Sequence, residues 1–394
     1  MALSHSWCAR NDHQGLANLS NYLARARNRI LPAPATGLPQ PTHVFIGNES
    51  ADLDSVVSSF VLAFYADCEG TPSAPVVNCP RSDLALRGDI VAIIAIVGID
   101  LKTILFVDDI AELWTVIDKI TLVDHNEIAP HQSSLSAKVT AVVDHHQDAG
   151  RFFDARPRVI EACGSCATLV FELCPLVVDK AKGNRTLAGL LLCAILMDTQ
   201  NMDAAAGKGT PRDAVALSAL SNYLQMTAEA RADLFASLAT QKQDQGHLST
   251  RDLLRRDYKQ FEACDTSVGI ASVGISFSKW VNRCSVKDMS LSADILQAFC
   301  TEKQIDCLVI MSSFTNINGI FCRELAIFPR SCEYSRFAEY VWKAFLSSFN
   351  SLKCVCLTFL TKIVCGVCPL EVYVSPCNTQ TLTCALSHMI STAI

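Results

Sequence analysis

The sequence predicts an α/β protein, in which a mainly parallel, helix-covered sheet is followed by a smaller α/β domain. From residue 42, short runs rich in Val and Ile alternate with helical stretches. Apolar strands that alternate with helices are typical of a parallel sheet buried on both faces. Three of these runs end in acidic clusters, as expected where strands meet polar loops at one edge of a sheet.

The N-terminal part, residues 1–41, is predicted to hold a helix around 16–30 and a Pro-rich lead-in, LPAPATGLPQP. Residues 42–245 are expected to form the first domain. Its strands are expected at THVFIG, DIVAIIAIVG, KTILFVDD, KITLVDHN and KVTAVVDHH, because these runs are short, apolar and β-branched. Its helices are expected over 53–67, 165–174 and 185–198.

The predicted second domain, residues 246–330, follows a charged helical stretch over 210–262. Within that stretch we interpret the run TRDLLRRDYKQF as a solvated helix face near a domain boundary. The elements expected beyond it are a helix near 290–304 and strands near 268–276, 306–312 and 317–328.

The tail, residues 331–394, is rich in cysteine and poor in charge. Its C-x-C and C-x-x-C pairs lack the spacing of a four-ligand zinc site, so we predict no zinc there. Lys362 and Glu371 interrupt its apolar run, and a charge at the centre of a membrane helix costs roughly 2.5–3.5 kcal/mol. No stable membrane span is therefore expected.

The composition restricts the class of partner and the compartment. A net charge of −6 provides no broad basic surface, so nucleic-acid binding is not expected. The 19 cysteines are an odd number scattered through apolar runs, which does not indicate a disulfide framework. The first 15 residues lack the apolar run of a secretory signal. We therefore predict a cytoplasmic protein.

Acidic side chains stand at strand or helix ends in four places: Asp52 and Asp54 in GNESADLDS, Asp124 in LVDHNE, Asp144 in VVDHHQD and Asp198 in LMDTQN. Each alone could cap a helix, and Asp144 could orient a neighbouring imidazole. Together at one sheet edge they would repel one another unless cations were bound. Carboxylates with one imidazole suit Mn²⁺, Mg²⁺ or Co²⁺. We predict that the D-x-D acids hold cations and cap the following helix as a secondary role.

The D-x-D loop, VDHN and VVDHH resemble the motifs of the DHH phosphoesterase superfamily. The longer strings GNESADLDS, LALRGDIV, GSCATLV, LLLCAILMDTQNMD, GKGTPRDA and LLRRDYKQF resemble those of eukaryotic exopolyphosphatases and prune-type proteins. The resemblance covers about residues 42–328, in order, and stops before the Cys-rich tail.

The resemblance implies a hydrolase of phosphoric anhydrides, specifically a metal-dependent exopolyphosphatase. Its DHH domain would hold two divalent cations, Mn²⁺ or Mg²⁺, with Co²⁺ as a further option. Hydroxide generated there would attack the terminal phosphate of short inorganic polyphosphates. The smaller DHH-associated domain would close over the phosphate chain, and the sequence leaves open whether that domain is complete before the tail begins.

The same resemblance assigns the metal ligands residue by residue. Asp52 matches a ligand of the first cation, Asp54 one of the second, and Asp124 the bridging carboxylate. His145 and Asp198 match further ligands of the second cation.

Four other residues carry expectations about substrate and metal. By resemblance, His146, Lys208 and Arg323 contact phosphate. Asn48 stands where family II pyrophosphatases carry a histidine ligand, which favours exopolyphosphatase and leaves the occupancy of the first metal site open. Ser165 begins a helix whose N-terminal amides could face an anion, although a plain N-cap is the simpler interpretation.

Two other functions remain as alternatives. A nuclease or cyclic-nucleotide phosphodiesterase would be a related enzyme, but the sequence lacks a Gly-Gly-Gly-His loop and an aromatic-rich basic groove. A weakly catalytic, prune-like regulatory protein would act through signalling partners in cell motility. The intact acids and histidines argue against that alternative, and the divergent tail argues for it.

Overall fold

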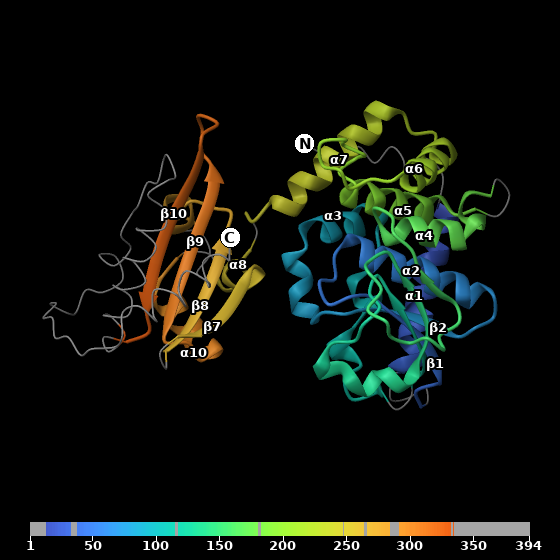
Figure 1. Ribbon diagram of the computed structural model, residues 1–394, viewed down its shortest axis with the longest axis horizontal. Helices are drawn as coiled ribbons and strands as arrows, with labels where there is room; N and C mark the ends of the chain where they lie inside the picture. The colour runs from blue at the N-terminus through green and yellow to red at the C-terminus, as the bar shows by residue number, and fades with distance from the viewer. Residues whose placement is uncertain are drawn as a thin grey trace, which may run out of the picture. The chain divides into compact units, whose positions relative to one another are not determined.

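The computed structural model describes residues 13–331 except 33–37, 115–116, 180–182, 247, 264–265 and 284–290, together with Tyr334. The predictions for the Cys-rich tail, including the absence of zinc, lie outside the described residues. The chain divides into two units, Met1–Gln243 and Asp244–Ile394, which are taken in turn (Figure 1).

The first unit is built on a six-stranded sheet with the order β3-β2-β1-β4-β5-β6, and every pair of neighbours is parallel. The chain moves outward from β1 to β3 and then crosses to β4 on the other side of β1. In sheets of this kind ligands bind beyond the carboxyl ends of the strands where the order reverses, here between β1 and β4. The strands are β1 (Thr42–Ile46), β2 (Ser73–Val77), β3 (Leu105–Phe106), β4 (Ile117–Val123), β5 (Val139–Asp144) and β6 (Arg158–Ile160).

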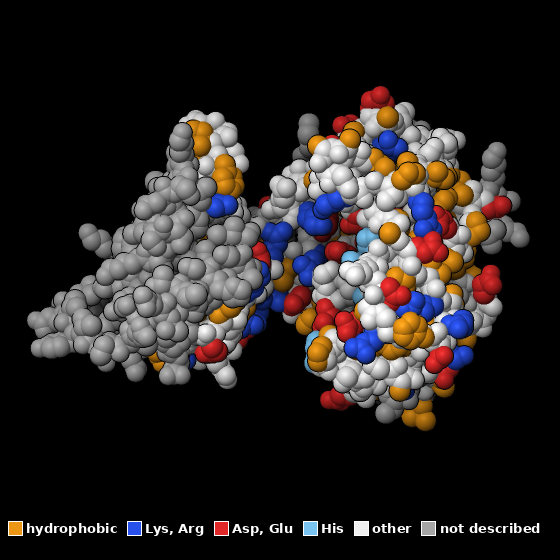
Figure 2. Space-filling model, in the orientation of Figure 1, with side chains coloured by type: hydrophobic (Ala, Val, Ile, Leu, Met, Phe, Trp, Pro, Cys, Tyr) orange, Lys and Arg blue, Asp and Glu red, His pale blue; other side chains and the backbone are white. Residues whose placement is uncertain are grey.

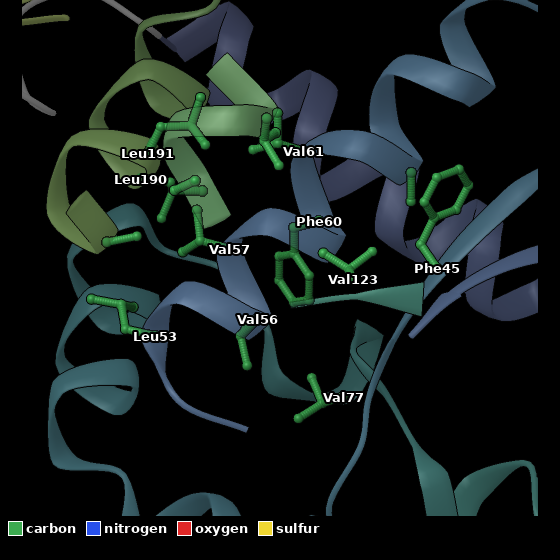
Figure 3. Close-up of a cluster of buried hydrophobic side chains, with 14 of the residues drawn as sticks. Phe45, Leu53, Val56, Val57, Phe60, Val61, Val77, Val123, Leu190 and Leu191 are labelled. Atoms are coloured by element: carbon green, nitrogen blue, oxygen red, sulfur yellow. The ribbon is translucent and has the colours of Figure 1, made fainter. Parts of the chain in front are cut away.

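Helices cover this sheet and enclose a large apolar core (Figure 1). Side chains of α2 pack against Val77 of β2, Val123 of β4 and Leu190 of α5 (Figure 3). The helix α5 is buried along almost its whole length, so its last residue, Asp198, is carried into the interior of the unit. The helices are α1 (His13–Ile30), α2 (Leu53–Cys68), α3 (Gly88–Val97), α4 (Cys166–Leu173), α5 (Arg185–Asp198), α6 (Pro211–Leu224) and α7 (Ala228–Gln243).

Several predicted elements of the first unit were wrong. The run over 89–98 is not a strand but helix α3, which ends at Gly98 with a left-handed φ of 68°. A continuous apolar run suits a buried helix as well as a buried strand, so periodicity could not separate the two. Strands β2 and β6 were not predicted, and of the predicted strand KTILFVDD only β3 forms. The parallel, helix-covered sheet itself is confirmed.

The second unit holds a four-stranded mixed sheet with the order β10-β9-β8-β7. Its central pair, β8 and β9, is parallel, and both outer pairs are antiparallel. The strands are β7 (Tyr258–Ala263), β8 (Thr266–Val273), β9 (Cys307–Thr315) and β10 (Phe321–Pro329), and the helices are α8 (Thr250–Arg256), α9 (Phe277–Val281) and α10 (Ala293–Lys303). The helical stretch predicted over 210–262 was too long, because the strand β7 begins at Tyr258.

The core of this unit is centred on Trp280, which is fully buried and donates its indole N–H to Thr250 Oγ1 at 2.9 Å. The prediction of a smaller α/β region after the parallel sheet is confirmed. Across the described part of the chain, no helix combines the length and apolar character needed to cross a membrane.

Candidate metal centre

The loop after β1 brings the two acids of the D-x-D motif to the start of α2. Asp52 is the N-cap of this helix, and its Oδ1 accepts a hydrogen bond from the Ser55 amide at 3.1 Å. The turn requires glycine at position 47, because a Cβ there would lie 2.3 Å from Ser55 Oγ. The capping interpretation of Asp52 is therefore confirmed, and its role as a cation ligand stays a prediction.

Asp54 belongs to the first turn of α2, and its buried side chain faces the N-terminus of another helix, α4. Its carboxylate accepts hydrogen bonds from the backbone amides of Cys166 at 2.6 Å and Ala167 at 2.7 Å, in the first turn of α4. Ser58 Oγ donates a third hydrogen bond at 3.1 Å. Helix N-termini favour negative charge, so α4 partly offsets the cost of burying this carboxylate. The anion that faces the helix after Ser165 is thus the protein's own Asp54.

Asp124 follows β4 in a left-handed backbone conformation, with φ at 63°. Its side chain is 2% exposed, and Oδ2 accepts a hydrogen bond from Asn48 Nδ2 at 2.8 Å. Its other oxygen, Oδ1, is buried and has no hydrogen-bond partner in the described structure. An unpaired buried carboxylate oxygen is costly, so this atom is suited to hold a cation.

Asn48 is oriented as a donor toward the acids. Its Nδ2 also donates to the Asp124 carbonyl oxygen at 3.1 Å. Its Oδ1 accepts hydrogen bonds from Ser50 Oγ at 2.6 Å and from the Ala51 amide at 3.1 Å. The amide oxygen, which is the only atom of this side chain suited to bind a cation, is therefore already occupied.

His145 is held between a backbone carbonyl and two acids. Its Nδ1 lies 2.9 Å from the carbonyl oxygen of Cys163 and donates to it, which leaves Nε2 to face the carboxylates. Nε2 lies 3.2 Å from Asp124 Oδ1 and 3.9 Å from Asp54 Oδ2. Burial opposes protonation of this imidazole, but the two carboxylates outweigh it and raise the pKa of His145 to about 9.

The buried carboxylates of this group resist ionisation together. Burial and the charge of Asp54 raise the pKa of Asp124 to about 8, and the same two causes raise the pKa of Asp198 to about 10. Burial also raises the pKa of Asp54, and the charge of Asp52 adds to the effect on all three. Without a cation the group retains protons, so metal binding would release them.

A second acid–imidazole pair lies next to this group, and both carboxylate oxygens of its acid are hydrogen-bonded. Asp144, which is completely buried, accepts from His146 Nδ1 at 2.8 Å and from the His146 amide at 3.2 Å. Its other oxygen accepts from Asn126 Nδ2. Burial alone would raise the pKa of Asp144, but the bonds from His146 and Asn126 outweigh it and lower that pKa. The hydrogen bond to Asp144 in turn raises the pKa of His146. The expectation that Asp144 orients an imidazole is confirmed.

The two predicted basic phosphate contacts belong to different units. Lys208 is exposed in the loop between α5 and α6. Its carbonyl oxygen lies so near Gly164 that a Cβ added to this glycine would be 2.8 Å away. That close approach fixes the Lys208 backbone beside the segment that leads into α4. Arg323 lies on β10 of the second unit, with its guanidinium carbon 5.5 Å from the centre of the Phe321 ring.

The donor set fits a divalent cation. Asp124, His145 and His146 offer ligand atoms that all lie within 4.8 Å of one another, so this group joins two of the five predicted ligands to the predicted phosphate contact His146. Two buried carboxylate oxygens, Asp124 Oδ1 and Asp198 Oδ2, have no hydrogen-bond partner in the described structure. Figure 2 shows histidine side chains at the surface of the first unit beside acidic and basic ones. The His146 side chain is 55% exposed, so an ion or phosphate could reach it.

Two supporting groups were not predicted from the sequence. Asn126 binds Asp144, and the Cys163 carbonyl orients His145. Asn126 stands in the VDHN string, two residues after Asp124, but a lone asparagine after a strand carries no signal of its function. A backbone carbonyl leaves no trace in the sequence at all.

Comparison with known proteins identifies the family of the chain. Residues 43–195 match the N-terminal domain of the DHH family, and residues 236–357 match the DHHA2 domain. The chain is 35% identical to human exopolyphosphatase PRUNE1 over 73% of this chain and 63% of that protein. It is 34% identical to the Bos taurus exopolyphosphatase PRUNE1 over 79% of this chain and 67% of that protein.

A more distant relative is the manganese-dependent inorganic pyrophosphatase of Methanocaldococcus jannaschii, which is 25% identical over 58% of this chain and 70% of that protein. The chain spans about two thirds of the length of the PRUNE1 proteins. It therefore belongs to the DHH family and is a prune-type member of it, with a DHHA2 domain after the DHH domain.

Proposed function

We propose that this protein is a metal-dependent exopolyphosphatase that removes terminal phosphate from short inorganic polyphosphates. The observation that carries the proposal is the group of acids at the ends of β1, β4 and α5, in which, among the described residues, the buried atoms Asp124 Oδ1 and Asp198 Oδ2 lack hydrogen-bond partners. Buried acids with unpaired oxygens and raised pKa values favour bound cations over any purely structural role.

The relatives support this proposal. The PRUNE1 proteins are named exopolyphosphatases, and the M. jannaschii relative is a manganese-dependent pyrophosphatase. All act on phosphoanhydride bonds according to these names. Asn48 favours the exopolyphosphatase, because its amide cannot replace a histidine ligand in the orientation that the structure shows.

The five proposed ligands are Asp52, Asp54, Asp124, His145 and Asp198, and they would hold two divalent cations, Mn²⁺ or Mg²⁺. Cations at such a site supply a hydroxide nucleophile at neutral pH and neutralise phosphate oxygens. The protein fixes three of these ligands before any ion binds. The α4 amides hold Asp54, Asn48 holds Asp124, and the Cys163 carbonyl holds His145.

Substrate contacts are proposed for His146, Lys208 and Arg323. The Nε2 atom of His146 is free to donate to a phosphate or leaving oxygen, because Nδ1 is bound to Asp144. Lysine binds phosphate as a point charge and arginine binds it through two parallel hydrogen bonds. We propose that Arg323 carries the contact of the second domain, residues 246–330, with the phosphate chain.

We also propose that the protein works in a reducing compartment, the cytosol. None of the nine cysteines of the described structure forms a disulfide, and six of them are buried. Free buried thiols are typical of intracellular proteins.

Phosphate release should be measured from tripolyphosphate, tetrapolyphosphate and pyrophosphate, with Mg²⁺, Mn²⁺ or Co²⁺ and with EDTA. Wild type and D124A would be compared side by side. We expect metal-dependent release that is faster from the polyphosphates than from pyrophosphate, and loss of at least about 100-fold in D124A because a ligand is removed.

Two results would overturn the proposal. The first is no release from a folded wild type that has bound Mn²⁺. The second is D124A that turns over at the wild-type rate, since that result would remove the acid group from the reaction.

A further inference from the structure

The side chain of Asn126 makes three hydrogen bonds in the interior next to the metal centre. It is 5% exposed. Its Nδ2 donates to Asp144 Oδ2 and to the Gln147 carbonyl oxygen at 3.0 Å. Its Oδ1 accepts from the Ala149 amide at 2.7 Å. Both amide hydrogens and the amide oxygen are therefore used.

These bonds converge on one imidazole. Asn126 holds one oxygen of Asp144, and the other oxygen holds both Nδ1 and the backbone amide of His146. Asn126 also fixes the chain just after His146, at Gln147 and Ala149. An acceptor at Nδ1 keeps a proton on that nitrogen and leaves Nε2 to exchange a proton with the substrate.

We propose that Asn126 is a positioning residue for His146. Through Asp144 it selects the imidazole form with hydrogen on Nδ1, and through the 147–149 backbone it sets the place of the ring. This inference rests on the proposed function, in which His146 contacts phosphate.

The proposal requires the donating amide and not only the size of the side chain. N126D has the same shape and keeps an acceptor for the Ala149 amide, but it cannot donate and it places a second carboxylate against Asp144. The double variant N126D/D144N restores one hydrogen bond with its direction reversed, from the new amide at 144 to the new carboxylate at 126. If Asn126 only filled space, N126D would act through its added charge alone, and N126S, which adds no charge, would leave the His146 signal unchanged.

The first measurement is independent of activity. With ¹⁵N-labelled histidine, NMR at one pH reports which ring nitrogen of His146 carries hydrogen, and H146Q identifies its signals. We expect hydrogen on Nδ1 in wild type, a mixture of both forms in N126D, and recovery in N126D/D144N. An unchanged His146 signal in folded N126D would overturn the proposal.

The second measurement is steady-state hydrolysis of tripolyphosphate with Mn²⁺. We expect N126D to lower kcat by about 10–100-fold, the usual loss when a group that orients an active residue is removed. The Kd for Mn²⁺, measured by calorimetry, should change less than about threefold, because Asn126 hydrogen-bonds to none of the five proposed ligands. In an H146Q background N126D should cost almost nothing more. Additive losses of kcat in N126D/H146Q would overturn the proposal.

Two further variants keep the test decisive. N184D places a new carboxylate at another buried asparagine, the N-cap of α5, where aspartate serves equally well, and it should behave like wild type. If N126D does not fold, N126S removes the same donors without adding charge and must show the same NMR change. If wild type releases no phosphate, the proposed function fails, while the NMR measurement still decides the role of Asn126.

Discussion

Two acid–imidazole pairs stand side by side in this protein, and they are built in opposite ways. In the first, His145 Nε2 lies 3.2 Å from Asp124 Oδ1, which has no hydrogen-bond partner in the described structure. In the second, His146 Nδ1 lies 2.8 Å from Asp144, and both oxygens of Asp144 are hydrogen-bonded. The pKa of Asp124 is raised to about 8, whereas that of Asp144 is lowered.

The difference supports the proposal of a cation site at Asp124 and gives no such support at Asp144. The environment of Asp144 supplies donors for the charged carboxylate, so that pair is complete in the protein alone. The environment of Asp124 places further acids beside it, and a ring nitrogen of His145 lies 3.2 Å from its Oδ1 in a geometry that forms no hydrogen bond. We therefore propose different roles for these neighbouring residues of one sequence motif, a cation ligand for His145 and a proton donor to substrate for His146.

Among the substitutions, D124N should have the largest effect on activity and stability. D124N should lower kcat by at least about 100-fold. In EDTA at pH 8.5, however, we expect its Tm to lie above that of wild type, because the change removes a buried carboxylate that is costly to ionise. Asparagine also tolerates the left-handed φ at this position. The measurement is thermal unfolding with and without EDTA.

The substitution D144N is the matched variant for D124N. D144N should lower the Tm in EDTA, because the pKa of Asp144 is lowered in the folded protein and its charge therefore stabilises the fold at neutral pH. Equal destabilisation by both variants would show that the two pairs do not differ in the way described here.

The pH dependence of the metal-free protein gives the next largest effect. The folded-state pKa values of Asp124 and His145, about 8 and about 9, exceed their ordinary values of roughly 3.9 and 6.5. The folded state therefore binds more protons than the unfolded state, and its stability falls as pH rises from 6 to 9. We expect the Tm in EDTA to drop by at least about 3 °C over this range.

Mn²⁺ should reverse that drop, because the cation takes the place of the protons. The gain in Tm on adding Mn²⁺ should be larger at pH 8.5 than at pH 6, and D124N should show little gain at either. A metal-free protein that becomes more stable toward pH 9 would contradict the assignment of the raised pKa values.

Removal of the Asn48 donor should have a moderate effect. N48A leaves Asp124 Oδ2 without its bond at 2.8 Å, so we expect the Kd for Mn²⁺ to rise by about 10-fold. The matched control is S50A, which removes a donor to Asn48 Oδ1 but leaves both bonds from Nδ2, and its Kd should stay within about twofold. Equal effects of both variants would mean that the loop, and not the donated hydrogen bond, determines affinity.

A third acid–imidazole pair should show the smallest effect. His131 Nε2 lies 2.9 Å from Glu49, but the two side chains are 67% and 47% exposed. Water solvates both partners, so such pairs contribute little. H131Q should change the free energy of unfolding by less than about 0.5 kcal/mol and kcat by less than about twofold. A large loss of kcat would add Glu49 and His131 to the site.

Much of this fold could be predicted from residue patterns. Short β-branched runs that alternate with helices indicated a parallel sheet, and the acids at the ends of β1, β4 and β5 indicated the edge at which we propose the site. The predictions were wrong where the pattern was ambiguous. Helix α3 is apolar on all sides, so nothing in its composition distinguishes it from a buried strand, and the short strand β2 contains Pro75, which usually indicates a loop.

The sequence by itself determined which chemical groups are present and which of them follow strands. It placed Asp52 and Asp54 at a helix start and put two histidines directly after Asp144. Only the tertiary structure decided which acid is paired with which donor. Asp54 receives its amides from α4, more than 100 residues later, and Asp144 receives its donor from Asn126 on the neighbouring strand end. The ionisation of a buried carboxylate depends on the donors and charges within a few ångströms, and those neighbours are brought together by packing and not by their order in the chain.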